Sequence, residues 1–454
     1  MYTYSKQIPV LASADVLVVG SGSAGATAAI TAARLGRRQS LSLPAPVRVM
    51  LVERYGFLGG TSTMVLDTFY GFYTPGRATK RVVSGVADDV INGLKKIDQA
   101  IERPNTFGAG TGITYNPEFL KVVWERLALE AGVDLLLHTF VVDVAMKADR
   151  ITGVIVSSKA GLGLIQAGMV VDATGDADIA ARCGVPFERA GDIDPAQTLT
   201  TTFRLANVNN TEAATLSRAA FVEKLKEAAA SGNYDLPRKE GSVHITPIPG
   251  VMATILTRVS VADPTNPWDL TRAETEGRRQ ALEYERFLRD FVPGYKDARI
   301  VAFSTQIGVR ETRRVYGEYR LTREDVLGAR KFDDVIGLCG APIEDHHGGE
   351  GTRWDYLPDG ETVSIPYRTL VPQKVDRLLV AGRCFSATHD AHASVRSMAQ
   401  CMAMGQAAGA AAVLCLKTGS TFRELSYPDL RDVLLQTGAT LETPSAAYSE
   451  HLRS

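Results

Sequence analysis

The sequence predicts an α/β protein in which a domain with a parallel sheet and a β-meander is interrupted by an inserted α+β domain. Three observations predict this class. A glycine-rich turn joins an apolar run to an alanine-rich one within residues 15–35. Short apolar runs with turn-like breaks cover residues 135–171, and a stretch from about 199 to 368, with prolines and tryptophan in its loops, has a different composition. Strand and helix patterns that alternate along the chain favour an α/β class.

The first turn has the spacing of a phosphate-binding loop. The stretch reads DVLVVGSGSAG, an apolar strand followed by glycines and the start of a helix. Gly20 permits the tight bend, Gly22 lets backbone approach a pyrophosphate, and Gly25 lets the helix pack against the sheet. Ser23 and Ala24 lie at the helix start, where free N–H groups and the positive end of the helix dipole favour an anion.

A second apolar strand is predicted at residues 47–52, and it ends in Glu53. An acid at this place binds a ribose hydroxyl in dinucleotide-binding units, usually about 20 residues after the turn. Here the separation is longer, and the excess falls in residues 37–46, a polar insert with proline. We expect a surface loop there, which costs little chain entropy. Strand, turn, helix and acid together predict a Rossmann-like dinucleotide-binding unit.

Composition sets the limits of the function. The chain has 454 residues, 45% of them hydrophobic and 22% charged, with a net charge of −1. This length indicates two or three lobes, and the charge argues against a nucleic-acid partner or a polybasic membrane surface. The most apolar segment, residues 399–416, is expected to be a buried helix and not a membrane span. No signal peptide is apparent and the five cysteines are scattered without a CxxC pair, so a cytoplasmic location is expected.

The remaining elements follow from periodicity and turn residues. We expect a helix from about residue 116, followed by a β-meander over 135–144, 151–158 and 164–171 that ends in the loop DATGDAD at 172–178. Later in the chain we expect a long polar helix over about 272–291, a strand at 377–382 and a helix over about 395–416.

These elements predict a discontinuous organisation. We expect residues 1–70, 113–198 and 369–420 to form the nucleotide-binding domain. Residues 71–112 and 199–368 are expected to form a substrate or cap domain, and residues 421–454 a C-terminal tail.

Three strand ends carry a resemblance to a known family. GSGSAG, DATGDAD and LLVAGRCFSATHDAHASVRSMAQCMAMGQAAGAA occur in the order seen in FAD-dependent oxidoreductases of the glutathione-reductase-like superfamily. IGVRETRRVYGEY and IPYRTLVP also resemble family segments, so the likeness covers nearly the whole chain. More distantly, the chain resembles the fumarate reductase flavoproteins. The resemblance implies a Rossmann-like FAD-binding domain and FAD as the cofactor.

The resemblance also implies which residues contact FAD. The glycines of the first turn would hold the pyrophosphate, Glu53 the adenosine ribose, and the backbone of Val142 the adenine. A helix beginning near Ser394 would aim its positive N-terminus at the flavin, where it stabilises the anionic reduced ring. The full implied set is Gly20, Gly22, Ser23, Ala24, Gly25, Glu53, Arg54, Gly60, Thr61, Val142, Ala173, Thr174, Gly175, Gly382, Arg383, Ser394 and Val395.

Histidines are the candidates for proton transfer. His346, His347, His389 and His392 are four of only seven histidines and form two clusters in loops expected to face the cofactor. Histidine titrates near neutral pH and can accept or donate the proton that accompanies a hydride. His389 and His392 are the first choices, with His346 as a further catalytic candidate. The alternative for each is a hydrogen-bonded loop histidine.

A metal site is an alternative for one of these clusters. His346 and His347 lie beside Asp345 and Glu350, whose side chains are all able to ligate a metal. The set lacks a firm ligand spacing such as HExxH, so no metal is predicted.

Arginines near the middle of the chain suggest a carboxylated substrate. Arg310, Arg313 and Arg314 form a dense group, and Arg396 lies near the expected flavin-facing helix. Guanidinium groups bind carboxylates bidentately, which makes Arg310 a candidate for the catalytic site. The alternative is that these arginines pair internally with nearby acids, namely Glu311, Glu318 or Asp325.

Taken together, the sequence predicts an FAD-dependent oxidoreductase, a dehydrogenase or oxidase, that transfers a hydride between a small organic substrate and flavin. Three alternatives remain open: a redox-neutral flavoenzyme such as a hydratase, isomerase or lyase, an NAD-dependent dehydrogenase, and a flavin-binding subunit of a larger enzyme. The DATGD and AGR segments disfavour the NAD alternative. Substrate identity, the electron acceptor, covalent attachment of FAD and formation of a homo-oligomer are left open.

Overall fold

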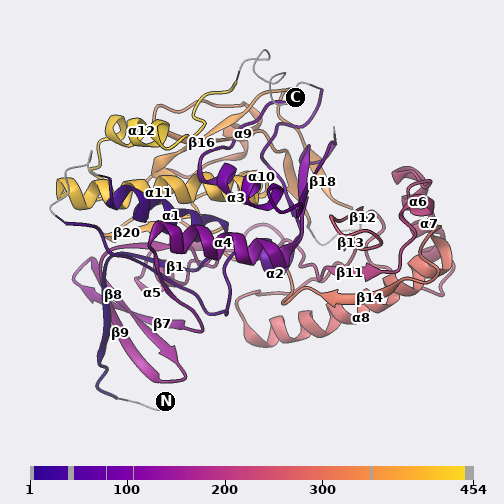
Figure 1. Cartoon of the computed structure of the whole chain (residues 1–454), viewed down its shortest axis with the longest axis horizontal. Helices are drawn as coiled ribbons and strands as arrows, with labels where there is room; N and C mark the ends of the chain where they lie inside the picture. Colours follow the sequence, from indigo (N-terminus) through magenta and orange to yellow (C-terminus); the bar gives the residue numbers. More distant parts are fainter. Residues whose placement is uncertain (1–4, 39–44, 78, 106, 348–350, 445–454) are drawn as a thin grey trace.

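The computed structural model describes residues 5–38, 45–77, 79–105, 107–347 and 351–444. Figure 1 shows a larger lobe built on a sheet and long helices, and a smaller lobe that extends from it on the right of the view. Three predicted features lie in part outside the described residues: residues 39–44 of the insert, Glu350, and residues 445–454 of the tail.

The larger lobe contains a seven-stranded mixed sheet. Its order is β6-β2-β1-β9-β8-β7, and β20 also pairs with β9. Strands β6, β2, β1, β9 and β20 run parallel to one another, while β8 is antiparallel to both of its neighbours, β9 and β7. The parallel strands end at one edge of the sheet, where ligands bind in folds of this class. The bounds are β1 (Val10–Val19), β2 (Val49–Val52), β6 (Asp134–Leu136), β7 (Phe140–Lys147), β8 (Arg150–Ser158), β9 (Gly161–Asp172) and β20 (Leu378–Val380).

Two helices cross the sheet in close contact, α1 (Ser23–Gly36) and α11 (Met398–Thr418). A Cβ added at Gly405 would lie 2.1 Å from the backbone oxygen of Ala24, and one added at Gly409 would lie 2.3 Å from that of Ala28. These glycines therefore let the two backbones touch. By length and composition alone α11 is apolar enough to cross a membrane, but 83% of its most apolar window is buried inside the protein, which confirms the predicted buried helix.

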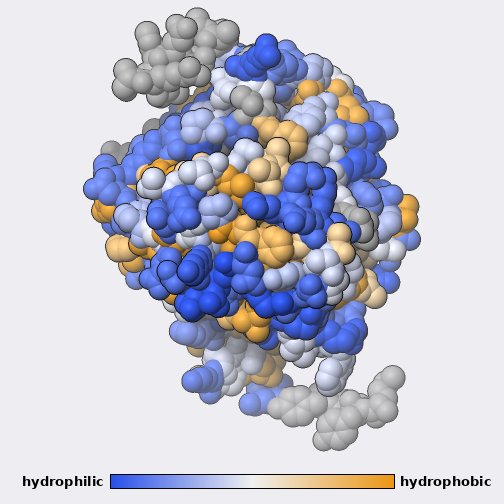
Figure 2. All heavy atoms as spheres, turned by 90° about the vertical axis from the view of Figure 1, so that its right-hand side faces the viewer, coloured by the Kyte–Doolittle hydropathy of each residue, from blue (hydrophilic) through white to orange (hydrophobic). Residues whose placement is uncertain are grey.

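The smaller lobe is an antiparallel sheet covered by helices. Its strand order is β12-β13-β11-β14, and its own core includes Phe203, Tyr284 and Phe287. Figure 2 faces this side and shows apolar side chains in small patches among hydrophilic ones. The bounds are β11 (Phe203–Ala206), α6 (Asn210–Ala213), α7 (Arg218–Ala230), β12 (Ser242–Ile245), β13 (Met252–Ile255), α8 (Pro267–Phe291) and β14 (Arg299–Phe303).

Further elements complete the larger lobe. Among them, the hairpin of β17 (Ile343–Asp345) and β18 (Arg353–Asp355) and the helix α10 (His389–Val395) carry side chains of the candidate site. The others are α2 (Thr61–Met64), β3 (Thr68–Phe69), α3 (Val86–Lys95), β4 (Ala100–Arg103), β5 (Gly112–Tyr115), α4 (Pro117–Ala131), α5 (Asp178–Arg182), β10 (Phe187–Arg189), β15 (Arg313–Val315), α9 (Arg323–Leu327), β16 (Val335–Cys339), β19 (Val363–Pro366), the 3-10 turn Tyr367–Thr369 and α12 (Tyr427–Gln436).

Most predicted elements are confirmed, but the last long helix is not a single element. The expected helix over 395–416 begins only at Met398, and Val395 is instead the end of α10. Ser397 is extended, with φ −59° and ψ 151°, and this separates the two helices. The loop expected to hold His389 and His392 is also helical, because the Thr388 side chain caps the first turn of α10.

Candidate functional site

A cavity of about 470 Å³ lies where β1, β2, β9 and β20 end, and both lobes contribute to its walls. One part is lined by the glycine-rich turn and the ends of the parallel strands. The other is lined by arginines, acids and aromatic rings, some of them from the smaller lobe. A cavity with convergent polar groups at strand ends is the usual place for a ligand.

The three glycines of the first turn have different surroundings. An added Cβ would lie 2.6 Å from the Ala173 oxygen at Gly20 and 1.8 Å from the Gly20 oxygen at Gly25, so both pack against backbone. At Gly22 an added Cβ would meet no atom within 4 Å. Gly22 is also the N-cap of α1 and no side chain caps the helix there. The open space and the uncapped helix start fit a pyrophosphate.

Glu53 braces the same turn. Its Oε2 accepts hydrogen bonds from the Ser21 backbone N–H at 2.8 Å and from the Ser21 hydroxyl at 2.6 Å. Its Oε1 accepts from the Tyr55 N–H at 3.0 Å. Glu53 therefore fixes the conformation of the turn, and its side chain also lines the cavity. Its predicted contact is with the ribose of the cofactor.

The loop after β9 is shaped by carboxylates. Buried Asp172 accepts hydrogen bonds from Thr174 and from the N–H groups of α5, although burial raises its pKa. Asp176 accepts a hydrogen bond from Arg383 Nη2 at 2.7 Å. The Nη1 group of Arg383 is buried and, within the described residues, has no hydrogen-bond partner. A phosphate oxygen in the cavity would satisfy it.

The structure brings most of the implied cofactor residues to the cavity. Gly25 lies behind the turn, and Val141 lines the cavity where Val142 was expected. Ser394 and Val395 do not line it, because the helix whose N-terminus reaches the cavity is α11, with Ser397 and Met398 in the wall. The implied residues in the wall are Gly20, Gly22, Ser23, Ala24, Glu53, Arg54, Gly60, Thr61, Ala173, Thr174, Gly175, Gly382 and Arg383.

Three arginines form a cationic cluster at the other part of the cavity, Arg238, Arg310 and Arg396. Arg310 donates to the Thr198 carbonyl at 2.5 Å and Arg396 to the Gln197 side chain at 2.8 Å, both neutral partners. Burial lowers the pKa of all three. Within the described residues none is ion-paired, and the Nε groups of Arg238 and Arg396 have no hydrogen-bond partner.

The other predicted arginines do pair internally. Buried Arg314 forms ion pairs with Glu188 and Glu311, and Arg313 pairs with Asp178 at 3.1 Å. The internal alternative is therefore correct for Arg314, which pairs with the expected Glu311, whereas Arg313 pairs internally with Asp178, an acid outside the expected set. Arg310 and Arg396 face the cavity.

Glu344 and His346 lie beside the arginine cluster. His346 Nε2 is 2.9 Å from Glu344 Oε1, and its Nδ1 is 3.1 Å from the Thr352 hydroxyl. Burial, together with the charge of Arg310, lowers the pKa of His346 to about 3, so the ring is neutral at pH 7. Burial raises the pKa of Glu344, but contact with His346 and the charge of Arg396 outweigh it and bring the pKa to about 2.

The β17–β18 hairpin places these groups through its register. Glu344 pairs with Trp354, and Asp345 pairs with Arg353. Residues directly opposite in an antiparallel pair share a face, and neighbours along a strand point to opposite faces. Glu344 and Trp354 accordingly both line the cavity, while Asp345 and Arg353 contact α10.

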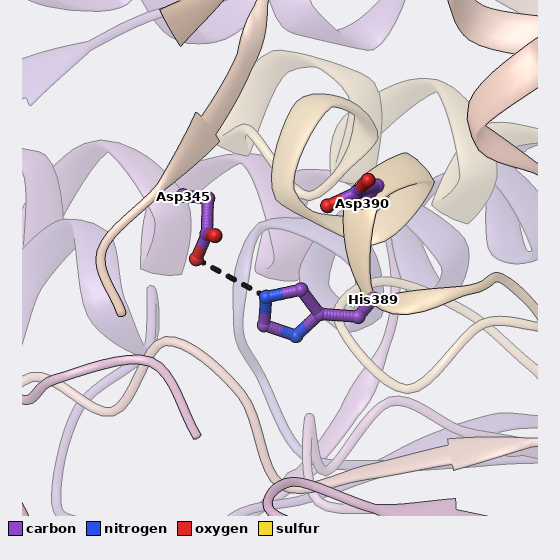
Figure 3. Close-up of side chains that lie close together, drawn as sticks. All are labelled: Asp345, His389 and Asp390. Carbon is purple, nitrogen blue, oxygen red and sulfur yellow. Dashed lines mark hydrogen bonds and ion pairs between the residues drawn. The ribbon is translucent and has the colours of Figure 1, made fainter. Parts of the chain in front are cut away.

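His389 lies on the far side of this hairpin and is not in the cavity wall. Figure 3 shows its ring pointing from α10 to Asp345, with Nε2 3.1 Å from Oδ1. Its Nδ1 is 3.0 Å from Glu311. Potential ligand atoms of Asp345, His389 and Asp390 lie within 4.8 Å of one another, but His389 contacts Asp345, and Asp390 is paired with Arg323 and Arg353. These cations already balance the carboxylates.

His392 does not line the cavity either, but it lies directly behind a wall residue, Arg383. It is fully buried, its Nε2 lies 2.7 Å from the Arg383 carbonyl, and its ring stacks on Phe385. Burial and the charges of Arg396 and Arg314 hold its pKa well below the usual value, so the ring is neutral. Of the predicted histidines, His346 is in the wall; His347 is instead 3.3 Å from Asp345 Oδ2.

Sequence reasoning missed Arg238, Glu344 and Trp354. Arg238 lies beside Lys239 and Glu240 in a charged stretch, and nothing in this stretch predicts burial. The alternation of Ile343, Glu344 and Asp345 could have indicated a strand with one polar residue on each face, but it does not identify which face meets a cavity.

Comparisons with known proteins support the cofactor. A family model described as FAD dependent oxidoreductase matches residues 15–434. No curated protein matches the chain. The solved structure of p-nitrophenol 4-monooxygenase PnpA from Pseudomonas putida DLL-E4 is 12% identical with a TM-score of 0.49, over 97% of this chain and 92% of that one.

Two further solved structures are similarly distant. A geranylgeranyl bacteriochlorophyll reductase-like protein from Thermoplasma acidophilum is 14% identical with a TM-score of 0.45, over 94% of this chain and 82% of that one. The flavin-dependent brominase Bmp2 is 13% identical with a TM-score of 0.46, over 92% of this chain and 83% of that one.

The family match spans the glycine-rich turn, the loop after β9 and all of α11. The open space at Gly22 and the free donor of Arg383 fit the pyrophosphate that such a cofactor carries. The chain therefore belongs to the FAD dependent oxidoreductase family, and its cofactor is FAD.

Proposed function

We propose that this enzyme transfers a hydride between a small carboxylated organic substrate and FAD, as a dehydrogenase or an oxidase. The observation that carries the proposal is the cluster of Arg238, Arg310 and Arg396 in the cavity wall, with no ion pair among the described residues. Unpaired buried cations are costly, so such a cluster favours an anionic ligand. The planar guanidinium fork suits a carboxylate.

The same proposal assigns the cofactor residues. Gly22 and Arg383 would hold the FAD pyrophosphate, Glu53 the ribose, and the loop of Gly60 and Thr61 would lie near the flavin. When bound, FAD accepts or donates the hydride. Residues 1–70, 113–198 and 369–420 would form the FAD-binding domain, and residues 71–112 and 199–368 the substrate or cap domain. We also propose that the chain belongs to the glutathione-reductase-like superfamily and is distantly related to the fumarate reductases.

Glu344 and His346 are the groups best placed to handle a proton. Glu344 keeps about a third of its side chain accessible, toward the cavity, and His346 holds it from behind. A carboxylate bound by Arg310 and Arg396 would offset the positive charge that now depresses both pKa values. The pair would then accept a substrate proton more readily when the substrate is present.

His389 and His392 would act as positioning residues. His389 ties α10 to the β17–β18 hairpin through Asp345, and His392 contacts the carbonyl of Arg383. Both would keep cavity residues in place without touching the substrate.

Anaerobic reduction of the bound flavin by a panel of hydroxy and amino carboxylates tests the function. We expect at least one acid to bleach the flavin absorption, and its amide to do so far less. The Arg238→Gln variant should raise KM about 10- to 100-fold through the loss of one charge-assisted contact. Arg126→Gln on α4, a partly exposed arginine near Glu130, is the matched control.

Two results would oppose the proposal. If an acid and its amide bleach the flavin equally, the substrate is not recognised through a carboxylate. If the product has the same oxidation state as the substrate, the enzyme catalyses redox-neutral chemistry.

A further inference from the structure

We infer that the substrate carries a planar aromatic ring as well as a carboxylate, and that the ring lies against Trp354 and Phe107. This inference rests on the proposed carboxylate-binding function and adds the substrate class to it.

Two aromatic side chains form a wall of the cavity, Phe107 and Trp354, and Tyr356 packs on Trp354 outside the cavity lining. The Phe107 and Trp354 ring centroids are 5.5 Å apart at 51°, and Trp354 stacks on Tyr356 at 6.4 Å and 17°. Phe107 remains 45% exposed, although it is large and apolar. Phe107 and Trp354 line the cavity. Exposed rings in a concave site are typical of ligand contact.

The wall is held in place by the backbone. Tyr356 accepts a hydrogen bond from the Gly108 N–H at 3.0 Å, which ties the loop after Phe107 to the strand β18 region. An added Cβ at Gly108 would lie 3.4 Å from the Trp354 ring, so this loop packs directly on the indole. The rings therefore form a prearranged surface, which limits the entropy lost when a ring binds.

The wall is adjacent to the charged part of the cavity. Trp354 pairs with Glu344 across the hairpin, and the two side chains share the face toward the cavity. Glu344 in turn contacts His346 and lies within electrostatic range of Arg310 and Arg396. One ligand can thus reach the arginines with a carboxylate and the rings with its apolar part.

The smaller lobe contributes a cation beside this wall. The guanidinium of Arg218, on α7, lies 5.3 Å from the Phe107 ring centroid. A cation over one aromatic face and apolar edges beside it favour a π-system, because rings prefer offset or edge-to-face contacts with other rings. A saturated ring would fill the space without these contacts.

Binding to the FAD-loaded enzyme tests the inference with four probes, read as changes in the flavin absorption spectrum. Benzoate carries ring and charge, cyclohexanecarboxylate a saturated ring and charge, benzyl alcohol a ring without charge, and glucuronate a sugar ring and charge. We expect benzoate to bind tightest, about tenfold more tightly than cyclohexanecarboxylate.

Two variants at one position separate ring contact from folding. Trp354→Ala should weaken benzoate about tenfold while leaving cyclohexanecarboxylate within about threefold, and Trp354→Phe should restore most of the loss. Trp268→Ala is the matched control, since Trp268 is 75% exposed at the start of α8 and is not in the cavity wall. Flavin content of each variant reports folding.

Each outcome decides one part. The inference of an aromatic ring is overturned if benzoate binding depends on Arg238 but not on Trp354, or if glucuronate binds more tightly than benzoate. Either result still supports a carboxylated substrate. If benzyl alcohol binding depends on Trp354 while benzoate binding does not depend on Arg238, the ring subsite is supported and the proposed carboxylate recognition is contradicted. If no probe perturbs the flavin spectrum, both are overturned.

Discussion

Gly22 differs from the glycines that flank it in the turn, because the space beside it is open and theirs is filled by backbone. This difference separates cofactor binding from folding at the scale of one residue. A side chain at Gly25 would have to displace the Gly20 carbonyl, whereas a side chain at Gly22 would only enter the cavity.

We expect Gly22→Val to fold and to purify without FAD, since the added methyl groups occupy the pyrophosphate position. Gly25→Ala should instead lower the unfolding temperature whether or not FAD is present. Flavin absorbance and thermal unfolding of the two variants measure these outcomes. Stoichiometric FAD in Gly22→Val would contradict the assignment of this space.

The neutral state of His346 predicts a pH dependence of stability. Its pKa is about 3 in the folded protein against an ordinary value of 6.5. The unfolded chain therefore binds more protons in this window, and the free energy of unfolding falls as the pH falls from 6.5 toward 3. The pKa of Glu344 is about 2, so protonation of this carboxylate also lowers the free energy of unfolding as the pH falls, but at lower pH than for His346.

Between pH 6.5 and 5 the His346 contribution is about 2 kcal/mol. In His346→Asn we expect the free energy of unfolding to fall by about 2 kcal/mol less over this interval than it does in the wild type, as measured by denaturant titration. Parallel declines in wild type and variant would show that the ring is not neutral in the folded state.

At the scale of elements, the contact of α1 with α11 controls the start of α1. Gly405 meets the backbone of Ala24, which lies in the first turn of α1 and in the cavity wall. A displacement at this contact therefore moves the phosphate-binding turn directly.

Gly405→Ala should destabilise the protein by about 1–3 kcal/mol through overpacking and also weaken FAD binding. Thermal unfolding and FAD titration give the two readouts, with Lys417→Ala at the exposed end of α11 as the control. A loss of stability with unchanged FAD affinity would mean that the turn does not follow α1.

The elements also show what the sequence can predict. The strand, turn and helix around Gly22 were predictable because their signals are local and repeat in a fixed order. The helix that contains His389 was not, because its cap at Thr388 and the break at Ser397 are set by single residues with ambiguous propensity. The arginine cluster could not be predicted in full, since Arg238 and Arg396 are far apart in the sequence and only the tertiary fold brings both to the cavity.

At the scale of the whole molecule, the cavity wall is shared by both lobes, so a ligand that fills it links them. Binding to the folded state stabilises it, by about 2.7 kcal/mol at a free ligand concentration of 100 times Kd. We expect FAD added to the apoprotein to raise the unfolding temperature more than ADP does, at matched occupancy. ADP reaches the glycine-rich turn alone, so equal shifts would contradict the extended placement of FAD.

The two faces of the β17–β18 hairpin have a consequence for how specificity can change. Positions 344 and 354 meet the cavity, whereas positions 345 and 353 anchor the hairpin to α10. Substitutions on the first face alter what is recognised while the anchor remains, so descendants of this scaffold can acquire new substrates by a few changes without redesigning the fold.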